Sequence, residues 1–188
     1  GRPRSKPAAA GFFISPDEAT PMSDQPAQLL AKLLQERIVY VADPITDGVA
    51  QLVLSQLDAL QADLDSPVTM YLTGKGGPVS CVLAIYEAML TVDYPIHTVA
   101  MGRVESWAAL LVAAGTPGQR CAAPAAQFSI GPPEVDGQGM DFQAYLKRVS
   151  NLCETYNRLL AKHTGKTPEA IGAISQSLQM SGSEAKDF

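Results

Sequence analysis

The serine at position 106 stands where a serine hydrolase would carry its nucleophile. It precedes the apolar run Trp107–Ala114, and the strand-like segment Ile96–Met101 lies shortly before it. A nucleophilic serine occupies a strand-to-helix turn of this kind, where backbone N–H groups point outward. The spacing therefore makes Ser106 a candidate nucleophile for acyl transfer.

A nucleophilic serine needs a base, and the chain contains two histidines. His97 opens the strand-like segment, and His163 ends a predicted helix, where a histidine usually serves the helix dipole. Glu105 adjoins Ser106 in sequence, but neighbouring side chains on such a turn point apart. Without a base the hydroxyl is a poor nucleophile at neutral pH. A dyad of Ser106 with Lys75 remains as the arrangement for an active serine peptidase with unorthodox groups.

The loop Gly74-Lys-Gly-Gly-Pro78 follows a predicted strand, a position where glycine-rich loops can bind phosphate. It lacks the spacing and the Ser/Thr of a P-loop, and Pro78 removes one N–H donor. Glycines at such a place also permit close backbone approach to a bound chain or an oxyanion. We expect that role for Gly76 and Gly77.

Composition and charge exclude several classes of partner. The 188 residues carry a net charge of -5 and are 46% hydrophobic, which gives no reason to expect nucleic acid or an anionic membrane. The longest apolar run, Trp107–Ala114, is too short for a membrane helix. Cys81, Cys121 and Cys153 lie far apart, which argues against a disulfide framework or a zinc site. We expect a soluble protein without metal or cofactor.

Helical and strand-like segments alternate from Gln25 onward, and they must position these residues. Strands are predicted over 37–42, 68–73, 96–101 and 127–130, and helices over 26–36, from 47, over 79–92, after 106 and over 142–163. Gly165 takes the C-cap position of the last helix. The alternation predicts one α/β domain over residues 25–188 with largely parallel strand pairing.

Residues 1–24 have no hydrophobic periodicity and are rich in Pro, Ala, Ser and Gly. We expect an irregular N-terminal extension there. Its first ten residues include basic side chains and no acid. They resemble the remnant of an organelle transit peptide, although an axial segment of an assembly is an alternative role.

Five blocks, in the same order, resemble the proteolytic subunit of the Clp protease. They are LLAKLLQERIVYVADPITDGVAQLVLSQL, YLTGKGGPVSCVLAIYEAM, VAMGRVESWAALLVAAGTPGQRCAAPAAQFSIGPP, LLAKHTGKTPEAI and MSGSEA. The resemblance extends from about Gln25 to the end of the sequence. It implies a crotonase-like (ClpP-like) spiral of β-β-α units with a protruding handle helix, assembled into heptameric rings that stack face to face.

The resemblance also implies a degenerate Ser-His-Asp triad. Ser106 falls on the nucleophile and keeps its hydroxyl, Gly131 falls on the histidine, and Ser177 falls on or near the aspartate. Glycine accepts no proton, and a neutral serine cannot stabilise an imidazolium. His163 matches a structural histidine of the family. The resemblance therefore predicts a subunit that is not an enzyme.

The surroundings of the triad differ from the family pattern as well. Trp107 replaces a methionine beside the former oxyanion region, which includes Gly76 and Gly77. We expect it to place bulk where a peptide carbonyl would meet the oxyanion donors. The segment PEVDGQG is shorter and less rich in glycine than its counterpart, which predicts weaker peptide binding by strand addition.

A chain of this type resembles a ClpR subunit, a non-catalytic paralogue that joins active ClpP and other ClpR-type subunits in one ring. The resemblance places it in a plastid stroma or in a cyanobacterial cytoplasm. The family's aromatic pockets for the Hsp100/Clp ATPase chaperone fall on Thr69, Tyr71, Thr91 and Cys121. Only Tyr71 keeps a ring there, so we expect weakened chaperone docking.

Two alternatives remain. The active serine peptidase described above is the first. The second is a crotonase-fold enzyme that binds acyl-CoA, against which stand the five blocks and the lack of an acid/base pair near the glycine loop. Residues 175–178 replace the family's charged stretch, so ion pairing between stacked rings is expected to be lost.

Overall fold

The computed structural model describes residues 25–42, 44–64, 66–131, 138–174 and 178–188. The predicted extension over 1–24, most of the PEVDGQG segment and Ser177 lie outside these ranges. Chain contacts divide the molecule into Gly1–Lys32 and Leu33–Phe188, and the second unit carries the sheet and every described site residue. Helix α1 (Gln25–Gln35) spans the division. The predicted boundary before residue 25 stays a prediction.

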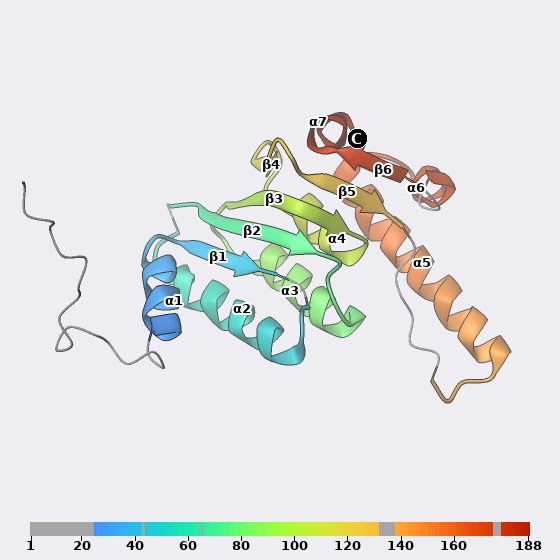
Figure 1. The fold of residues 1–188 in the computed structure, drawn as a ribbon, viewed down its shortest axis with the longest axis horizontal. Coiled ribbons are helices and arrows are strands. Elements are labelled where there is room, and N and C mark those ends of the chain that lie inside the picture. Colours follow the sequence, from blue (N-terminus) through green and yellow to red (C-terminus); the bar gives the residue numbers. More distant parts are fainter. Residues whose placement is uncertain (1–24, 43, 65, 132–137, 175–177) are drawn as a thin grey trace, which may run out of the picture. The chain divides into compact units, whose positions relative to one another are not determined.

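In the described part of the chain, six strands form one sheet in the order β1-β2-β3-β5-β6, with β4 also paired to β3 (Figure 1). The strands are β1 (Ile38–Val41), β2 (Val68–Gly74), β3 (Ile96–Glu105), β4 (Arg120–Ala122), β5 (Gln127–Ile130) and β6 (Leu178–Ser181). All pairs are parallel except β5–β6, which is antiparallel. The predicted α/β class with largely parallel pairing is confirmed.

Helices follow the strands in alternation over the first two-thirds of the described chain. They are α2 (Asp47–Ala59) with the short 3-10 turn Leu60–Ala62, α3 (Val79–Thr91), α4 (Trp107–Ala113), α5 (Phe142–Thr164), α6 (Pro168–Ile174) and α7 (Gly182–Asp187). The long α5 is capped by the Asp141 side chain and ends at Gly165 in the left-handed region, with φ 70°. The C-cap prediction for Gly165 is confirmed.

The core lies between the sheet and the helices α2, α3 and α4, which pack against it (Figure 1). Alternate residues of β2 are fully buried while their neighbours face outward, the pattern of a strand covered on one face. Almost the whole of α4 is buried. Thr98 in β3 donates its hydroxyl to the α4 carbonyl of Val112 at 2.8 Å, which fixes the helix to the strand.

Strand β3 is longer than the sequence predicts. The prediction ended the strand at Met101, and the next residue, Gly102, has φ 60°. The strand nevertheless continues to Glu105, immediately before Ser106, and its register with β2 shifts between Leu72 and Gly74. A bulge-like irregularity of this kind accommodates the positive φ of Gly102 without ending the strand. Among the described residues, no helix is long and apolar enough to span a bilayer.

Candidate active site

The topology brings Ser106 and Gly131, two of the three positions that the resemblance matches to a catalytic triad, to one edge of the sheet. Strands β3 and β5 are parallel, with Glu105 opposite Ser129, so both end at this edge. Strand β6 is antiparallel to β5 and begins here, with Leu178 opposite Ile130. Ser106 therefore follows β3 and Gly131 follows β5 at the carboxyl ends of the strands, where α/β proteins place their sites. Ser177, just before β6, is outside the described residues.

Ser106 occupies a strained turn between β3 and α4. Its φ of 46° and ψ of −118° lie in a region that favours glycine, a strain of about 1–3 kcal/mol that must be offset by its surroundings. Its N–H donates to Ser129 O at 3.0 Å, and its carbonyl accepts from Ala109 N–H and from the Tyr156 hydroxyl, each at 3.0 Å. The backbone of a nucleophile turn is thus preserved, as the strand–serine–helix spacing predicted.

The Ser106 hydroxyl does not have the environment of a nucleophile. Its Oγ is buried, and no hydrogen-bond partner reaches it within the described residues. A general base must lie within about 2.6–3.2 Å of the proton that it removes. Within the described residues, the oxygen therefore has neither a base nor exposure to an incoming carbonyl.

Neither histidine can supply that base. His97 is the second residue of β3 while Ser106 follows the strand's end, a separation of about 30 Å along an extended strand. His163 lies near the end of α5, and its Nε2 is hydrogen-bonded to the Tyr86 hydroxyl at 2.9 Å. Burial, with the nearby charges of Arg120 and Lys162, lowers the pKa of His163 to about 4. His163 thus lies at the end of a helix, as predicted, and its bond to Tyr86 gives it a second structural role.

The residues nearest to Ser106 in the sheet offer no substitute. Gly131 has no side chain to act as a base. The Glu105 carboxylate forms an ion pair with the Arg103 guanidinium, two residues earlier on the same face of β3. The carboxylate is therefore held by the cation on its own strand.

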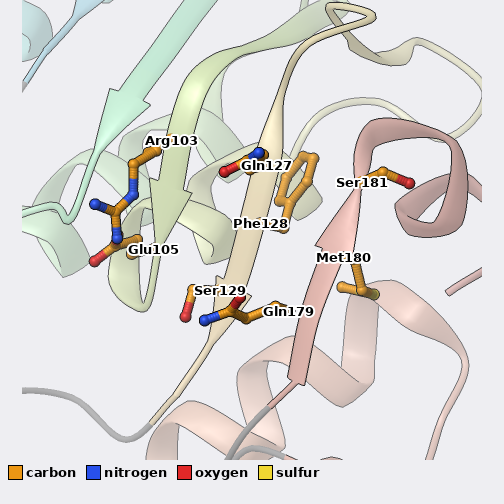
Figure 2. Close-up of a pocket in the computed structure, with 8 residues that line it drawn as sticks. All are labelled: Arg103, Glu105, Gln127, Phe128, Ser129, Gln179, Met180 and Ser181. Atoms are coloured by element: carbon orange, nitrogen blue, oxygen red, sulfur yellow. The ribbon is translucent and has the colours of Figure 1, made fainter.

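A cavity of about 360 Å³ lies on this face of the sheet beside the site (Figure 2). Its polar lining residues come from neighbouring strands in two cross-strand rows. They are Arg103, Gln127 and Ser181 in one row and Glu105, Ser129 and Gln179 in the other. Apart from the Arg103–Glu105 pair, these groups are neutral amides and hydroxyls, which can form hydrogen bonds but do not act as bases near neutral pH.

The two loop glycines make their close approaches to the chain itself. A Cβ on Gly77 would lie 2.2 Å from the Ile45 carbonyl oxygen, and one on Gly76 would lie 3.1 Å from Trp107 Cβ. Gly76 also accepts a hydrogen bond from Ile45 N–H at 2.9 Å. These contacts explain why both positions require glycine, and the predicted role of the two glycines toward a bound chain or an oxyanion stays a prediction.

The Trp107 ring is not where we expected it. Its side chain is 2% exposed and packs edge-on against the Tyr156 ring, with centroids 5.2 Å apart. The bulk therefore fills the core beneath the turn instead of the point where a peptide carbonyl would bind. The first six residues of α4, Trp107 included, are all buried. The Trp107 side chain therefore lies in the core with the rest of the helix.

The residues predicted to form the chaperone pocket are divided between the sheet and α3. Tyr71, Val99 and Cys121 occupy one cross-strand row of β2, β3 and β4, and Thr69 lies two residues earlier on the same face of β2. Thr91 ends α3 and donates its hydroxyl to Glu87 O. The structure therefore brings three of the four positions onto one sheet face.

Sequence reasoning missed a second aromatic ring on that face. Tyr40 of β1 is 46% exposed and stacks on Tyr71, with ring centroids 5.2 Å apart and an interplanar angle of 24°. Its hydroxyl reaches Met101 Sδ at 3.5 Å. The alternation of the predicted strand over 37–42 could have revealed it, since it places Tyr40 between the buried Val39 and Val41.

Comparison with known proteins is consistent with this architecture. A family model described as Clp protease matches residues 22–188. The ATP-dependent Clp protease proteolytic subunit 1 of Shouchella clausii (strain KSM-K16) is 35% identical over 175 residues, which cover 91% of each chain.

Proposed function

The chain belongs to the Clp protease family, and from that premise we propose that it is a non-catalytic, ClpR-type subunit of a Clp protease core. It would sit beside active ClpP and other ClpR-type subunits in a heptameric ring and contribute structure in place of peptide hydrolysis. Because the family is one of serine peptidases, the surroundings of Ser106 can be compared with those of a catalytic serine.

One observation carries the proposal: the Ser106 Oγ is buried and has no hydrogen-bond partner among the described residues. An active serine peptidase couples this oxygen to an imidazole, and loss of the triad costs on the order of 10⁴ to 10⁶ in kcat. Here Gly131 occupies the strand end where the resemblance implies that imidazole. The strained turn is retained by backbone and ring contacts that need no catalysis.

The wider role follows from the family resemblance. Clp proteases assemble into rings and work with Clp ATPases, so active subunits and an Hsp100/Clp chaperone are the proposed partners. The plastid stroma is the proposed compartment because the first residues are basic and free of acid. A cyanobacterial cytoplasm is the alternative.

The test is labelling with a fluorophosphonate, on the chain alone and in a complex with active Clp subunits. We expect no labelling of Ser106 under conditions that label the active subunits fully. Native mass spectrometry of the same complex should show this chain inside mixed rings. The chain alone should not form a stable double ring under gentle salt.

The outcomes separate the alternatives. Labelling of Ser106 at the rate of an active subunit would establish the peptidase with unorthodox groups, and a Lys75→Ala variant would then test its base. A double ring built from this chain alone would remove the dependence on active subunits. A matched Ser106→Ala variant controls for labelling elsewhere.

A further inference from the structure

A methionine lies beside the two stacked tyrosines on the sheet face proposed for the chaperone. Met101 belongs to β3, and Tyr40 of β1 donates its hydroxyl to the Met101 Sδ at 3.5 Å, across the intervening strand β2. Tyr71 of β2 stacks on the Tyr40 ring. The thioether is therefore part of the same surface as the two aromatic rings.

Solvent reaches this methionine. The alternation of buried and partly exposed residues along β3 places Met101 on the face that α2, α3 and α4 leave uncovered. Met70 in β2, Met180 in β6 and Met89 in α3 are buried. Met140 is partly exposed too, but it precedes α5 and lies outside the sheet. Within the described strands, Met101 is thus the one methionine open to a dissolved oxidant.

An accessible thioether is oxidised by hydrogen peroxide to a sulfoxide. The sulfur lone pair attacks one peroxide oxygen, the S–O bond forms and the O–O bond breaks. The second oxygen leaves as water with the proton that the first oxygen gives up, so the sulfur is oxidised, the peroxide is reduced and no other reactant is needed. The Tyr40 hydroxyl, already directed at Met101 Sδ, can then donate to the sulfoxide oxygen, which accepts hydrogen bonds better than thioether sulfur does.

From this contact and this exposure, we propose that Met101 is an oxidation site, and that its sulfoxide weakens docking of the chaperone on this subunit. The inference rests on the chaperone docking proposed above and adds its regulation. The sulfoxide places a strong dipole beside the Tyr40 and Tyr71 rings. An apolar chaperone loop that covers this dipole must take it out of water, which is unfavourable. Enzymatic reduction of the sulfoxide restores the thioether, so the change is reversible.

Peptide mass spectrometry tests the modification itself. The full-length chain is exposed to hydrogen peroxide for timed intervals, and each methionine-containing peptide is quantified. We expect the sulfoxide to form at Met101 at least about tenfold faster than at Met70, because Met70 is fully buried in the neighbouring strand. This readout needs neither the ring nor the chaperone.

The effect on docking is measured in assembled rings that contain the Thr69→Tyr variant. Thr69 lies on the same face of β2, two residues before Tyr71, so the added ring raises the docking signal. The variant is oxidised alone, its thiols are restored with dithiothreitol, which leaves a sulfoxide intact, and rings are then formed with untreated active subunits. A cross-linker on the exposed Cys121 reports the chaperone. We expect oxidation to lower cross-linking about fivefold or more.

Two further substitutions connect this effect to Met101. Met101→Leu keeps an apolar side chain of similar volume and should make docking insensitive to peroxide, whereas the matched Met140→Leu should keep the full sensitivity. The proposal is overturned if docking survives complete oxidation of Met101, if Met101→Leu stays sensitive, or if Met101 reacts no faster than Met70. Absence of cross-linking before any peroxide is added would instead refute the docking surface itself, and this inference with it.

Discussion

The hydroxyl of Tyr156 donates a hydrogen bond to the backbone carbonyl of Ser106 at 3.0 Å, across 50 positions of the chain. Tyr156 is completely buried in α5, and its ring packs edge-on against Trp107, the residue after the serine. Helix α5 therefore fixes the turn by two contacts of Tyr156, one with the Ser106 carbonyl and one with the Trp107 ring. A turn held in this way does not need a catalytic base to keep its shape.

Replacement of this tyrosine should destabilise the fold modestly. In Tyr156→Phe the ring contact with Trp107 remains, and the Ser106 carbonyl keeps its bond from Ala109 N–H. The loss should be about 1 kcal/mol, equivalent to a fall in Tm of roughly 2–4 °C. Thermal unfolding measures it. Tyr145→Phe, on the less buried part of α5, is the control and should shift Tm by under half as much.

The serine itself should be dispensable for stability. Because Ser106 Oγ is buried without a partner among the described residues, Ser106→Ala should leave the unfolding free energy within about 0.5 kcal/mol of the original. Ser106→Gly should relieve the positive-φ strain and be neutral or stabilising. Chemical denaturation checks both. A loss of more than 2 kcal/mol in Ser106→Ala would show that the hydroxyl has a partner after all.

The glycine loop should not tolerate a side chain at position 77. Gly77→Ala would place a Cβ 2.2 Å from the Ile45 carbonyl oxygen, and backbone on both sides must then move. We expect a loss above about 3 kcal/mol, at the diagnostic end of single substitutions. Gly118→Ala is the control: it has φ 81° but open space around it, so only about 1 kcal/mol of strain is expected. Equal effects would contradict the packing explanation.

The elements with clear periodicity were predictable from the sequence, and the short ones were not. The strand over 127–130 and the start of α5 at Phe142 match the prediction. The three-residue β4 has too few residues to show alternation, and it becomes a strand only through its bonds to β3. Strand β6 likewise depends on β5. Both are products of tertiary pairing.

The candidate site was predictable in position but not in orientation. The spacing around Ser106 correctly indicated a strand-to-helix turn. It could not show that Trp107 turns inward, because that depends on Tyr156, which lies far along the chain. Nor could it show that Gly77 approaches Ile45. Both features depend on contacts between segments that are distant in the sequence. The spacing of residues within one segment does not predict such contacts.

Acidification should destabilise the end of α5. The pKa of His163 falls from 6.5 to about 4 on folding, mainly through burial, so the folded state binds fewer protons between these values. Stability from this residue is complete above pH 6.5 and is lost as the pH falls toward 4. With solvent screening at this partly exposed ring, the loss should be about 1–2 kcal/mol.

Unfolding free energies at pH 7.5 and pH 4.5 measure this effect. His163→Gln can keep a hydrogen bond to Tyr86 without titrating, so it should flatten the pH dependence over this interval. Gln143→Asn, an exchange of two non-titrating side chains on an exposed part of α5, is the control and should leave the slope unchanged. If the slope survives in His163→Gln, another group is responsible.

The sheet face that carries Tyr40, Tyr71 and Cys121 should dock the chaperone weakly. We expect the loss of affinity to be smaller than the sequence alone implied. Thr69 and Cys121 lack rings, but Tyr40 stacks on Tyr71 and restores one exposed aromatic surface. Each missing phenyl-sized group contributes roughly 2 kcal/mol, about thirtyfold in affinity. We therefore expect a ring that contains this subunit to hold its chaperone through the other subunits.

Cross-linking through cysteine tests this expectation on the assembled complex. Cys121 is exposed while Cys81 is buried, so a thiol-reactive cross-linker on Cys121 reports whether a chaperone loop occupies this face. We expect little cross-linking in the original subunit and a clear increase in Thr69→Tyr, which adds a ring beside Tyr71. Tyr40→Ala should reduce even the residual signal. Cross-linking here as frequent as at the equivalent pockets of active subunits would refute the weakened docking.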